Sequence, residues 1–422
     1  MMQEMDETVA QNIIEELRKG IPPKRFVSTY SAGYDDILAD VRKQHLGRLS
    51  KTGGKIRFIS GSWGSGKTHF LRLLREQAFD AGCLVSSVEL TATDTSFNKF
   101  EKVFSGIIRN IASPAMYQTG NLDFAVPFGE VLRQALFGAL REPGQTVTPG
   151  RYQEARDALY GDSAIDMDFR RMVASYWGTY LPDAGDMAVL EDTRGSILSW
   201  FQGEGPVSIY RRRFGVQKIV SKDNARLMLQ SLVKFAPHLG CSGLVILFDE
   251  SEAAFSVMRR AALRDAHNNL LHLINEIGES QSLLLVYAAT PDFFVDERYG
   301  ITRYGALAQR IGRPQDHPPR ALDRIWNLDA TNITTNDMLE AATKIRAIYL
   351  SARPDESASI PDETTFRAQM ADLIRVHPQY SQVSIWRVLV TGAVEALDRA
   401  SYGEEVGPAE GFHEDIMRRL QE

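Results

Sequence analysis

The stretch Gly61-Ser62-Trp63-Gly64-Ser65-Gly66-Lys67-Thr68 decides the fold of this 422-residue chain. It matches the pattern G-x-x-x-x-G-K-[ST] at every fixed position, and in that pattern backbone N–H groups line a concave nest for phosphate oxygens. The preceding residues 55–60 are rich in β-branched and aromatic side chains and predict a short strand. Hydrophobic residues after the loop recur at helical spacing. This strand–loop–helix context predicts a phosphate-binding loop (P-loop) in an α/β fold with a parallel sheet.

Two side chains of the loop carry specific roles. Lys67 is expected to reach the β- and γ-phosphates of a nucleotide, and the hydroxyl of Thr68 is expected to bind Mg²⁺. The alternative is a glycine-rich turn without a ligand, which the flanking strand and helix and a partner motif downstream argue against. The sequence therefore predicts binding of ATP with Mg²⁺. The loop residues expected to contact the nucleotide are Gly61, Ser62, Trp63, Gly64, Ser65, Gly66, Lys67 and Thr68.

A second motif follows far downstream, at residues 244–250. A continuous hydrophobic run that ends in two acids indicates a strand buried on both faces, with carboxylates at its tip, where open α/β sheets bind ligands. Asp249 is expected to hold the Mg²⁺ through water, and Glu250 to polarise the water that attacks the γ-phosphate. The alternative is a helix N-terminus that favours acids. Paired with the P-loop, the motif predicts hydrolysis and not binding alone.

A third predicted strand, residues 283–289, ends at Thr290, whose hydroxyl can bond the attacking water or the γ-phosphate. A simple Thr-Pro turn is the alternative. The order of these three motifs resembles the AAA+ class of ATPases, in which the Thr290 position is called sensor 1. The following segment, 304–311, resembles the one that carries an arginine finger, with Arg310 at the matching place and Arg303 or Arg313 as substitutes. The finger would act on a neighbouring subunit's nucleotide and so implies a homo-oligomer; a solvated helix arginine is the alternative.

Composition narrows the class further. The chain is 44% hydrophobic and 24% charged, which suits a folded protein of two or three domains. Only two cysteines are present, without metal-ligand spacing, and no hydrophobic run is long enough to cross a bilayer. We therefore expect a cytoplasmic protein with no membrane association and no metal besides Mg²⁺. The net charge of −6 argues against a strongly basic nucleic-acid-binding surface.

Several segments resemble the family of ATP-binding proteins of the bacterial BREX system. They are residues 21–27 with Tyr30 and Gly33, residues 222–250, and residues 289–310. Within that family the chain is most similar to the smaller ATPase, because the larger relative is far longer. The resemblance implies anti-phage defence, with DNA-acting partner proteins such as a helicase and a methyltransferase, and it leaves the region of about 110–215 unmatched.

Three parts are expected along the chain. Residues 1–50 form an N-terminal helical segment that leads into the nucleotide site, and in ATPases of this class such a segment, here with Pro22 and Pro23, packs near the adenine. Residues 51–330 form a three-layer P-loop core, interrupted by a helical insertion at about 113–215, which is too long to be a loop. Residues 331–422 resemble the C-terminal helical lid of AAA+ proteins. There Arg387 has the sensor 2 position and would contact the γ-phosphate; the alternative is a surface arginine.

The candidate for contact with double-stranded DNA is the run 210–214, in which three arginines lie between two aromatic residues. A solvated turn whose arginines pair with acids is the favoured alternative. Two functions remain open at this point. The first is an AAA+-type ATPase that remodels or loads DNA or partner proteins as a ring. The second is a slow nucleotide-gated switch or scaffold that recruits other proteins.

Overall fold

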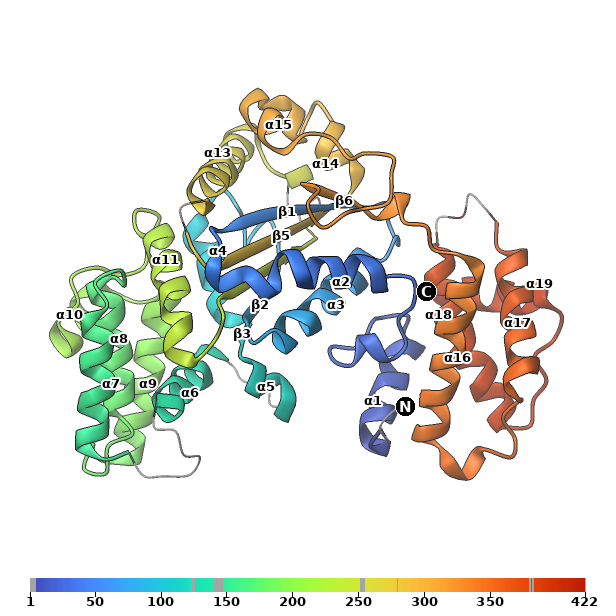
Figure 1. The fold of residues 1–422 in the computed structure, drawn as a ribbon, viewed down its shortest axis with the longest axis horizontal. Coiled ribbons are helices and arrows are strands. Elements are labelled where there is room, and N and C mark those ends of the chain that lie inside the picture. Colours follow the sequence, from blue (N-terminus) through green and yellow to red (C-terminus); the bar gives the residue numbers. More distant parts are fainter. Residues whose placement is uncertain are drawn as a thin grey trace.

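The computed structural model of the chain describes residues 5–120, 122, 126–139, 147–250, 255–278, 280–378, 381 and 383–421. Its centre is a six-stranded sheet in the order β3-β2-β4-β5-β1-β6, in which only the pairing of β2 with β3 is antiparallel (Figure 1). The strands are β1 (Lys55–Ser60), β2 (Leu84–Glu89), β3 (Ile111–Ala112), β4 (Leu244–Asp249), β5 (Leu283–Ala289) and β6 (Ile325–Asn327). The predicted α/β fold with a mostly parallel sheet is confirmed.

The register of the sheet brings the ends of three strands together. Strand β5 lies between β1 and β4 and is parallel to both. Ser60, at the end of β1, pairs with Ala289, at the end of β5, so the P-loop and Thr290 leave the same edge of the sheet. All seven residues of β5 and the first five of β4 are buried, as expected for strands covered on both faces.

Helices cover the sheet on two sides (Figure 1). On one side lie α2 (Asp35–Gln44) and α3 (Lys67–Asp80), the helix that begins within the P-loop; on the other lie α13 (Arg260–Ile277), α14 (Pro291–Val295) and α15 (Gly305–Ile311). Helix α4 (Phe100–Arg109) packs on β2, and α11 (Ala225–Phe235) packs on α4. Short 3₁₀ helices connect these elements: η1 (Val27–Thr29), η2 (Leu46–Lys51), η3 (Ala236–Leu239), η4 (Ile301–Arg303), η5 (Leu328–Ala330) and η6 (Pro354–Glu356).

The region that the sequence leaves unmatched is helical. Six helices, which we call the insertion helices, lie beside the β3 edge of the sheet (green in Figure 1). They enclose large buried aromatic side chains, and the indole N–H of Trp177 donates to the backbone oxygen of Leu132 at 2.8 Å, so a polar group in this core is satisfied. The insertion helices are α5 (Pro114–Thr119), α6 (Phe128–Ala139), α7 (Pro149–Gly161), α8 (Met167–Gly178), α9 (Met187–Phe201) and α10 (Val207–Phe214).

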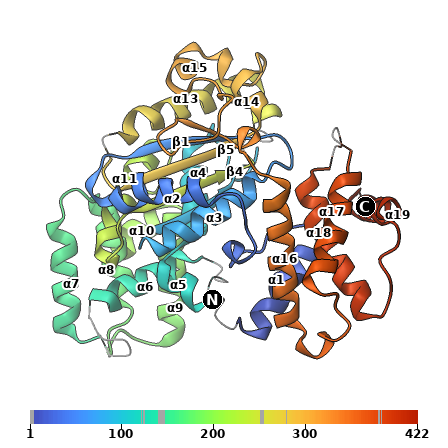
Figure 2. The same ribbon diagram turned by 45° about the vertical axis from the view of Figure 1, so that its right-hand side comes forward.

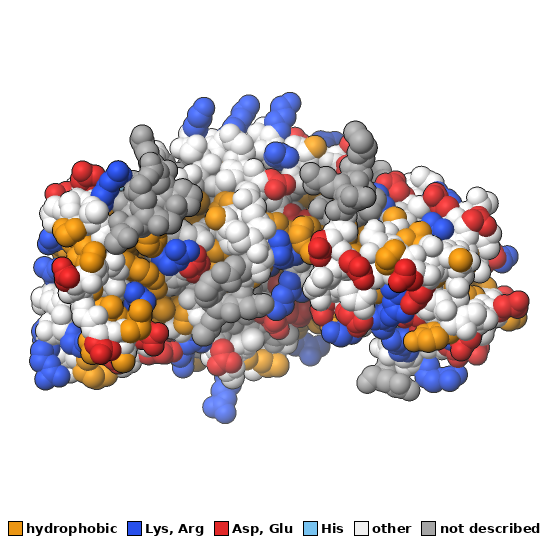
Figure 3. Space-filling view, turned by 90° about the horizontal axis from the view of Figure 1, so that it is seen from below, with side chains coloured by type: hydrophobic (Ala, Val, Ile, Leu, Met, Phe, Trp, Pro, Cys, Tyr) orange, Lys and Arg blue, Asp and Glu red, His pale blue; other side chains and the backbone are white. Residues whose placement is uncertain are grey.

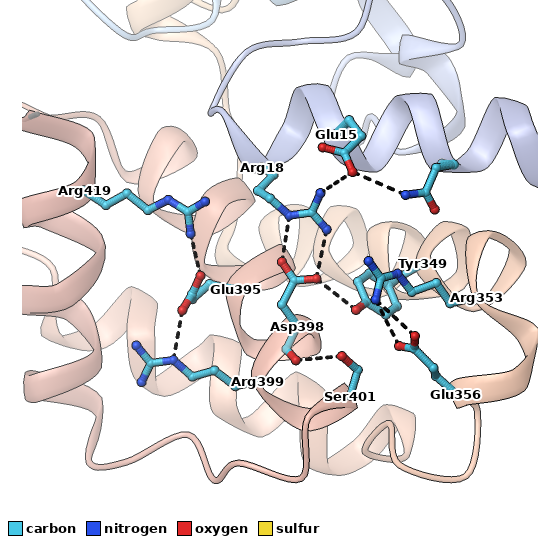
Figure 4. Close-up of polar contacts among 11 residues, drawn as sticks. Glu15, Arg18, Tyr349, Arg353, Glu356, Glu395, Asp398, Arg399, Ser401 and Arg419 are labelled. Atoms are coloured by element: carbon cyan, nitrogen blue, oxygen red, sulfur yellow. Dashed lines mark hydrogen bonds and ion pairs between the residues drawn. The ribbon is translucent and has the colours of Figure 1, made fainter.

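The two ends of the chain meet in space. Helix α1 (Glu7–Arg18) packs against two of the C-terminal helices, α16 (Thr335–Ala352) and α18 (Ile385–Ser401), and α17 (Glu363–Val376) and α19 (Ala409–Gln421) complete this body (Figures 1 and 2). Arg18 donates to both carboxylate oxygens of Asp398, at 2.8 and 2.9 Å, and Tyr349 donates to the same carboxylate at 2.9 Å (Figure 4). The N-terminal helix is thereby tied to the C-terminal helices.

Among the described residues, none of the helices combines the length and the apolar character that a membrane span requires.

Three histidines are held neutral inside the fold. Burial lowers the pKa values of His45, His69 and His267 from 6.5 to about 4. His45 is 1% exposed, and its Nε2 bonds the backbone oxygen of Ala321 at 2.7 Å. These histidines bind protons at a higher pH in the unfolded chain than in the folded one. Their contribution to the free energy of unfolding is therefore complete above about pH 6.5 and is lost as the pH falls towards 4.

We therefore expect each of these histidines to lower the free energy of unfolding by about 1.4 kcal/mol between pH 7.5 and pH 5.5. Urea unfolding at the two pH values measures the total loss. The variant His45→Asn serves as the comparison, because it removes one titrating group. Between the two pH values, the variant should lose less free energy of unfolding than the parent, by the share expected for one histidine. An equal loss in variant and parent would contradict the lowered pKa of His45.

Candidate functional site

A cavity of about 550 Å³ lies where three parts of the chain meet. The P-loop and the start of α3 form its floor, residues 17–34 form one wall, and α16 with the start of α18 forms another. The acidic side chain of Glu250 also lines it. The cavity therefore brings together the P-loop, the N-terminal segment and the C-terminal helices.

The shape of the P-loop explains its glycines. Gly64 and Gly66 adopt left-handed backbone conformations, with φ of 76° and 93°. At Gly64 there is also no space for a side chain, because a Cβ there would lie 2.6 Å from the Cβ of Ser384. Ser384 is the N-terminal cap of α18. The glycine thus lets the loop and the C-terminal helices approach each other closely.

Lys67 lies inside the loop. It is 8% exposed, and its ammonium donates to the backbone oxygens of Gly61, at 2.9 Å, and Ser62, at 3.2 Å. The same ammonium lies 5.4 Å from the ring centre of Trp63, which is 65% exposed. The positive charge is thereby placed within the nest of backbone N–H groups where phosphate oxygens bind in loops of this pattern.

The two acidic residues at the end of the β4 motif, Asp249 and Glu250, face the loop. Thr68 donates from its hydroxyl to Oδ2 of Asp249 at 2.7 Å, and the other oxygen of Asp249 accepts from the backbone N–H of Glu250 at 3.0 Å. Glu250 has a left-handed φ of 57° and lines the cavity. A hydroxyl beside a carboxylate is the type of oxygen ligand that Mg²⁺ takes in nucleotide sites, so these residues fit the ion that the sequence predicts.

The N-terminal wall is anchored to α3. His69 bonds the hydroxyl of Tyr30 at 3.2 Å and that of Ser31 at 2.8 Å. Glu76, which is 5% exposed, accepts from the backbone N–H groups of Val27 at 2.7 Å and Ser28 at 3.0 Å. These contacts hold the segment against the helix that follows the P-loop. Neither anchor is predictable from the sequence, because no local pattern links these positions.

Both predicted prolines lie in this wall. Pro22 lines the cavity together with Ile21, whereas Pro23 is buried and is not among the cavity-lining residues. Tyr34 also lines the cavity and is 4% exposed. This side of the cavity is therefore predominantly apolar and aromatic.

Asp329 makes a further contact that no local sequence pattern predicts. Both of its carboxylate oxygens accept from the backbone N–H of Ser62, at 2.9 and 3.0 Å, and one accepts from the Ser62 hydroxyl at 2.8 Å. Asp329 belongs to η5, directly after β6 and shortly before α16. It therefore ties the start of the P-loop to the connection between the sheet and the C-terminal helices.

The remaining predicted residues lie at three different places. Thr290 is 4% exposed, directly follows β5 at the N-cap position of α14, and is not among the residues that line the cavity. Arg387 is exposed on α18 and lines the cavity. Arg310 is exposed on α15, which contributes no lining residue to the cavity, and its predicted substitutes Arg303 and Arg313 are exposed as well. The structure thus brings Arg387 to the P-loop cavity and leaves Arg310 away from it.

Comparison with known families agrees with this geometry. The family model described as BREX system ATP-binding protein BrxC/D matches residues 5–415, nearly the whole chain. No curated protein and no solved structure gives a match. The match covers the P-loop, the acidic strand, the insertion helices and the C-terminal helices, including the region that the sequence analysis could not assign. The resemblance that the sequence predicts is therefore confirmed, and the chain belongs to the family of BREX system ATP-binding proteins BrxC/D.

Proposed function

We propose that this protein hydrolyses ATP as an AAA+-type ATPase of a BREX-like defence system. In this proposal hydrolysis drives the remodelling or loading of DNA, or of DNA-acting partners such as a helicase and a methyltransferase. One observation carries it: the hydroxyl of Thr68 lies 2.7 Å from Asp249, and Glu250 lines the same cavity as the P-loop. A site for binding alone does not require a second carboxylate at this place.

Each residue then has a defined task. The ammonium of Lys67 neutralises charge on the β- and γ-phosphates, while the N–H groups of the loop hold the phosphate oxygens. Thr68 and Asp249 hold Mg²⁺, which supplies charge neutralisation when bound. Glu250 accepts a proton from the attacking water, and the hydroxyl of Thr290 orients that water. Arg387 reaches the γ-phosphate from the C-terminal side.

The apolar wall takes the adenine. Ile21, Pro22 and Tyr34 line the side of the cavity formed by the N-terminal segment, and Trp386 lines the side formed by α18. A flat base is bound well between such side chains because they exclude water from its faces. Residues 1–50 and 331–422 then act together as a lid over a core of residues 51–330.

A slow nucleotide-gated switch is the second candidate. It is favoured because the N-terminal segment and the C-terminal helices line the same cavity as the P-loop. ATP bound there would order both of them together even without turnover. The rate of ATP hydrolysis, measured with and without double-stranded DNA, separates the two functions. A remodelling ATPase turns over many times and responds to its substrate, whereas a switch binds ATP and hydrolyses it rarely.

Glu250→Gln should retain ATP binding and slow steady-state hydrolysis by roughly two or more orders of magnitude, because the proton acceptor is lost. Lys67→Ala serves as the contrasting variant and should lose tight ATP binding, because the main positive charge of the loop is removed. Calorimetry measures binding and phosphate release measures turnover. A Glu250→Gln variant with normal turnover would refute the role of Glu250, and a Lys67→Ala variant that binds ATP normally would refute the P-loop assignment.

Asp329→Ala should weaken ATP binding by roughly tenfold, because Ser62 loses the acceptor that holds the start of the loop in place. Asp329→Asn retains an acceptor oxygen and should bind ATP nearly as well as the parent. Comparison of the two variants separates the effect of losing the hydrogen-bond acceptor from the effect of losing the negative charge. If Asp329→Ala binds ATP as tightly as the parent or more tightly, removal of a negative charge outweighs the lost contact, and the positioning role is wrong.

Arg310→Ala should lower turnover while leaving ATP affinity nearly unchanged, since a finger acts on charge that develops in the transition state. Because Arg310 lies away from the chain's own cavity, the effect should be exerted on a neighbouring subunit. Mixing Arg310→Ala with Lys67→Ala should then restore part of the activity, because the first variant supplies an intact P-loop and the second an intact finger.

The matched control is Arg375→Ala, which removes an exposed arginine of α17 and should change neither turnover nor complementation. Mass measurement in solution with ATP completes the test. A protein that stays monomeric and whose Arg310→Ala variant hydrolyses ATP normally would exclude the ring and leave the switch.

A further inference from the structure

A second cavity, of about 430 Å³, lies away from the P-loop, between the start of α13 and the segment that joins η4 to α15. We call it the arginine cavity. Arg260 and Arg264 lie one helical turn apart, and His267 follows after a further turn, so one face of α13 presents all three. Arg303 closes the opposite side. The lining residues are Arg260, Ala261, Arg264, His267, Arg303 and Tyr304.

The charge of the arginine cavity is not neutralised within the part of the chain that the structure describes. Arg260, Arg264 and Arg303 are exposed and make no ion pair with a described carboxylate. Among the described residues, Arg303 donates to the backbone oxygen of Arg298 at 3.1 Å. Helix α13 is 18 residues long, and its N-terminus adds the positive end of its dipole at this place. Three guanidinium groups around one cavity form a strong site for an anion.

A buried polar atom gives an independent indication of a ligand. His267 is 2% exposed, and its Nε2 is buried without a hydrogen-bond partner in the described structure. The ring is held by a hydrogen bond to the backbone of Tyr299 and lies between Phe255, at 5.5 Å, and Tyr304, at 6.4 Å. Burial, and secondarily Arg303, lowers its pKa to about 4, so the imidazole is neutral. Because the ring N–H of the neutral imidazole already bonds the Tyr299 backbone, Nε2 is left as an acceptor, and a hydroxyl or water at a bound group would satisfy it, whereas the arginines are the groups that face an anion.

We propose that the arginine cavity binds a phosphate of a nucleic-acid backbone. Guanidinium groups match phosphate oxygens in fork geometry, and a neighbouring tyrosine ring offers a face to a sugar or base. Further exposed arginines come from the elements around the cavity, which suits an extended polyanion better than a single acidic side chain. They are Arg259, Arg298 and Arg313.

The run of arginines in the insertion helices is the competing candidate for a DNA-binding surface. Two of its arginines already have hydrogen-bond or ion-pair partners. Arg213 forms an ion pair with Asp192 at 3.0 Å and also bonds Thr193 and Ser196. Arg211 donates to the backbone oxygen of Gln217. Figure 3 shows that hydrophobic, acidic and basic side chains are mixed over the insertion helices on the face drawn there. The run lies in helix α10 and not in the turn of the alternative, whose pairing of arginines with acids applies to Arg213.

The arginine cavity and the P-loop site are also connected along the chain. Helix α13 follows β4, which ends at Asp249, and His267 stacks on Phe255 in the connection between them. Nucleic acid bound here would therefore lie close to Phe255, which belongs to the connection that follows β4. DNA binding itself requires no hydrolysis, so the inference can be tested whether or not the protein is an ATPase.

The test uses the full-length protein, a fluorescein-labelled 30-base-pair DNA duplex, and fluorescence anisotropy between about 50 and 300 mM salt. Arg260→Ala/Arg264→Ala should weaken binding by on the order of tenfold and reduce the slope of log K against log salt by about two, because two phosphate contacts are lost. Arg260→Lys/Arg264→Lys keeps the charges and should retain most of that slope. The same comparison in a Lys67→Ala background should give the same loss.

Arg211→Ala/Arg212→Ala is the matched control, because it also removes two exposed positive charges, and it should bind DNA like the parent. Three results would overturn the proposal. The parent could fail to bind DNA at 50 mM salt, the control double variant could lose binding while Arg260→Ala/Arg264→Ala does not, or sodium tripolyphosphate could bind at the cavity where DNA does not. Unchanged melting temperatures of both double variants would show that they are folded.

Discussion

The hydrogen bond between Thr68 and Asp249 depends on the register of three parallel strands. Thr68 follows β1 and Asp249 ends β4, and the two strands are separated by β5, so both pairings of β5 must be correct for a hydroxyl and a carboxylate to meet at 2.7 Å. A slip of one residue in either pairing would turn the strand's side chains to the opposite face. The fully buried β5 is therefore as important to the site as the P-loop. The insertion helices, which enter the chain between β2 and β4, leave this register intact because they lie beside the edge of the sheet.

The cavity above these strands is completed by the two ends of the chain. Helix α1 is fixed to α18 by the bidentate contact of Arg18 with Asp398, a geometry that holds both orientation and distance (Figure 4). The segment that follows α1 is fixed to α3 by Glu76. One wall of the cavity is thus connected both to the C-terminal helices and to the helix that begins in the P-loop. A movement of the C-terminal helices would be transmitted to the N-terminal wall, because they share buried packing and a partly buried ion pair.

Local patterns predicted most of the fold and part of the site. The P-loop, the buried strands and the helical character of the insertion depend on residues that are near one another in the sequence, so periodicity and motif spacing reveal them. Asp329 was missed because its partner Ser62 lies 267 residues away, and Glu76 was missed because it contacts backbone N–H groups, which leave no trace in the sequence. The same limit applies to the arginine cavity, where α13 and η4 meet only in the fold. The consecutive arginines at 211–213 were conspicuous in the sequence, yet Arg213 is already paired with Asp192.

The conformation of Glu250 shows how the backbone completes the site. Successive side chains of an extended strand point to opposite faces, so Asp249 and Glu250 would be turned away from each other if β4 continued. Instead, Glu250 adopts a left-handed φ of 57°, at a cost of about 1–2 kcal/mol for a residue with a side chain. The hydrogen bond from its N–H to Asp249 stabilises this turn. As a result Asp249 contacts Thr68 while Glu250 lines the same cavity. An unfavourable conformation that brings two carboxylates to one P-loop is best explained by the chemistry of the site, since glycine or asparagine would form the same turn with less strain.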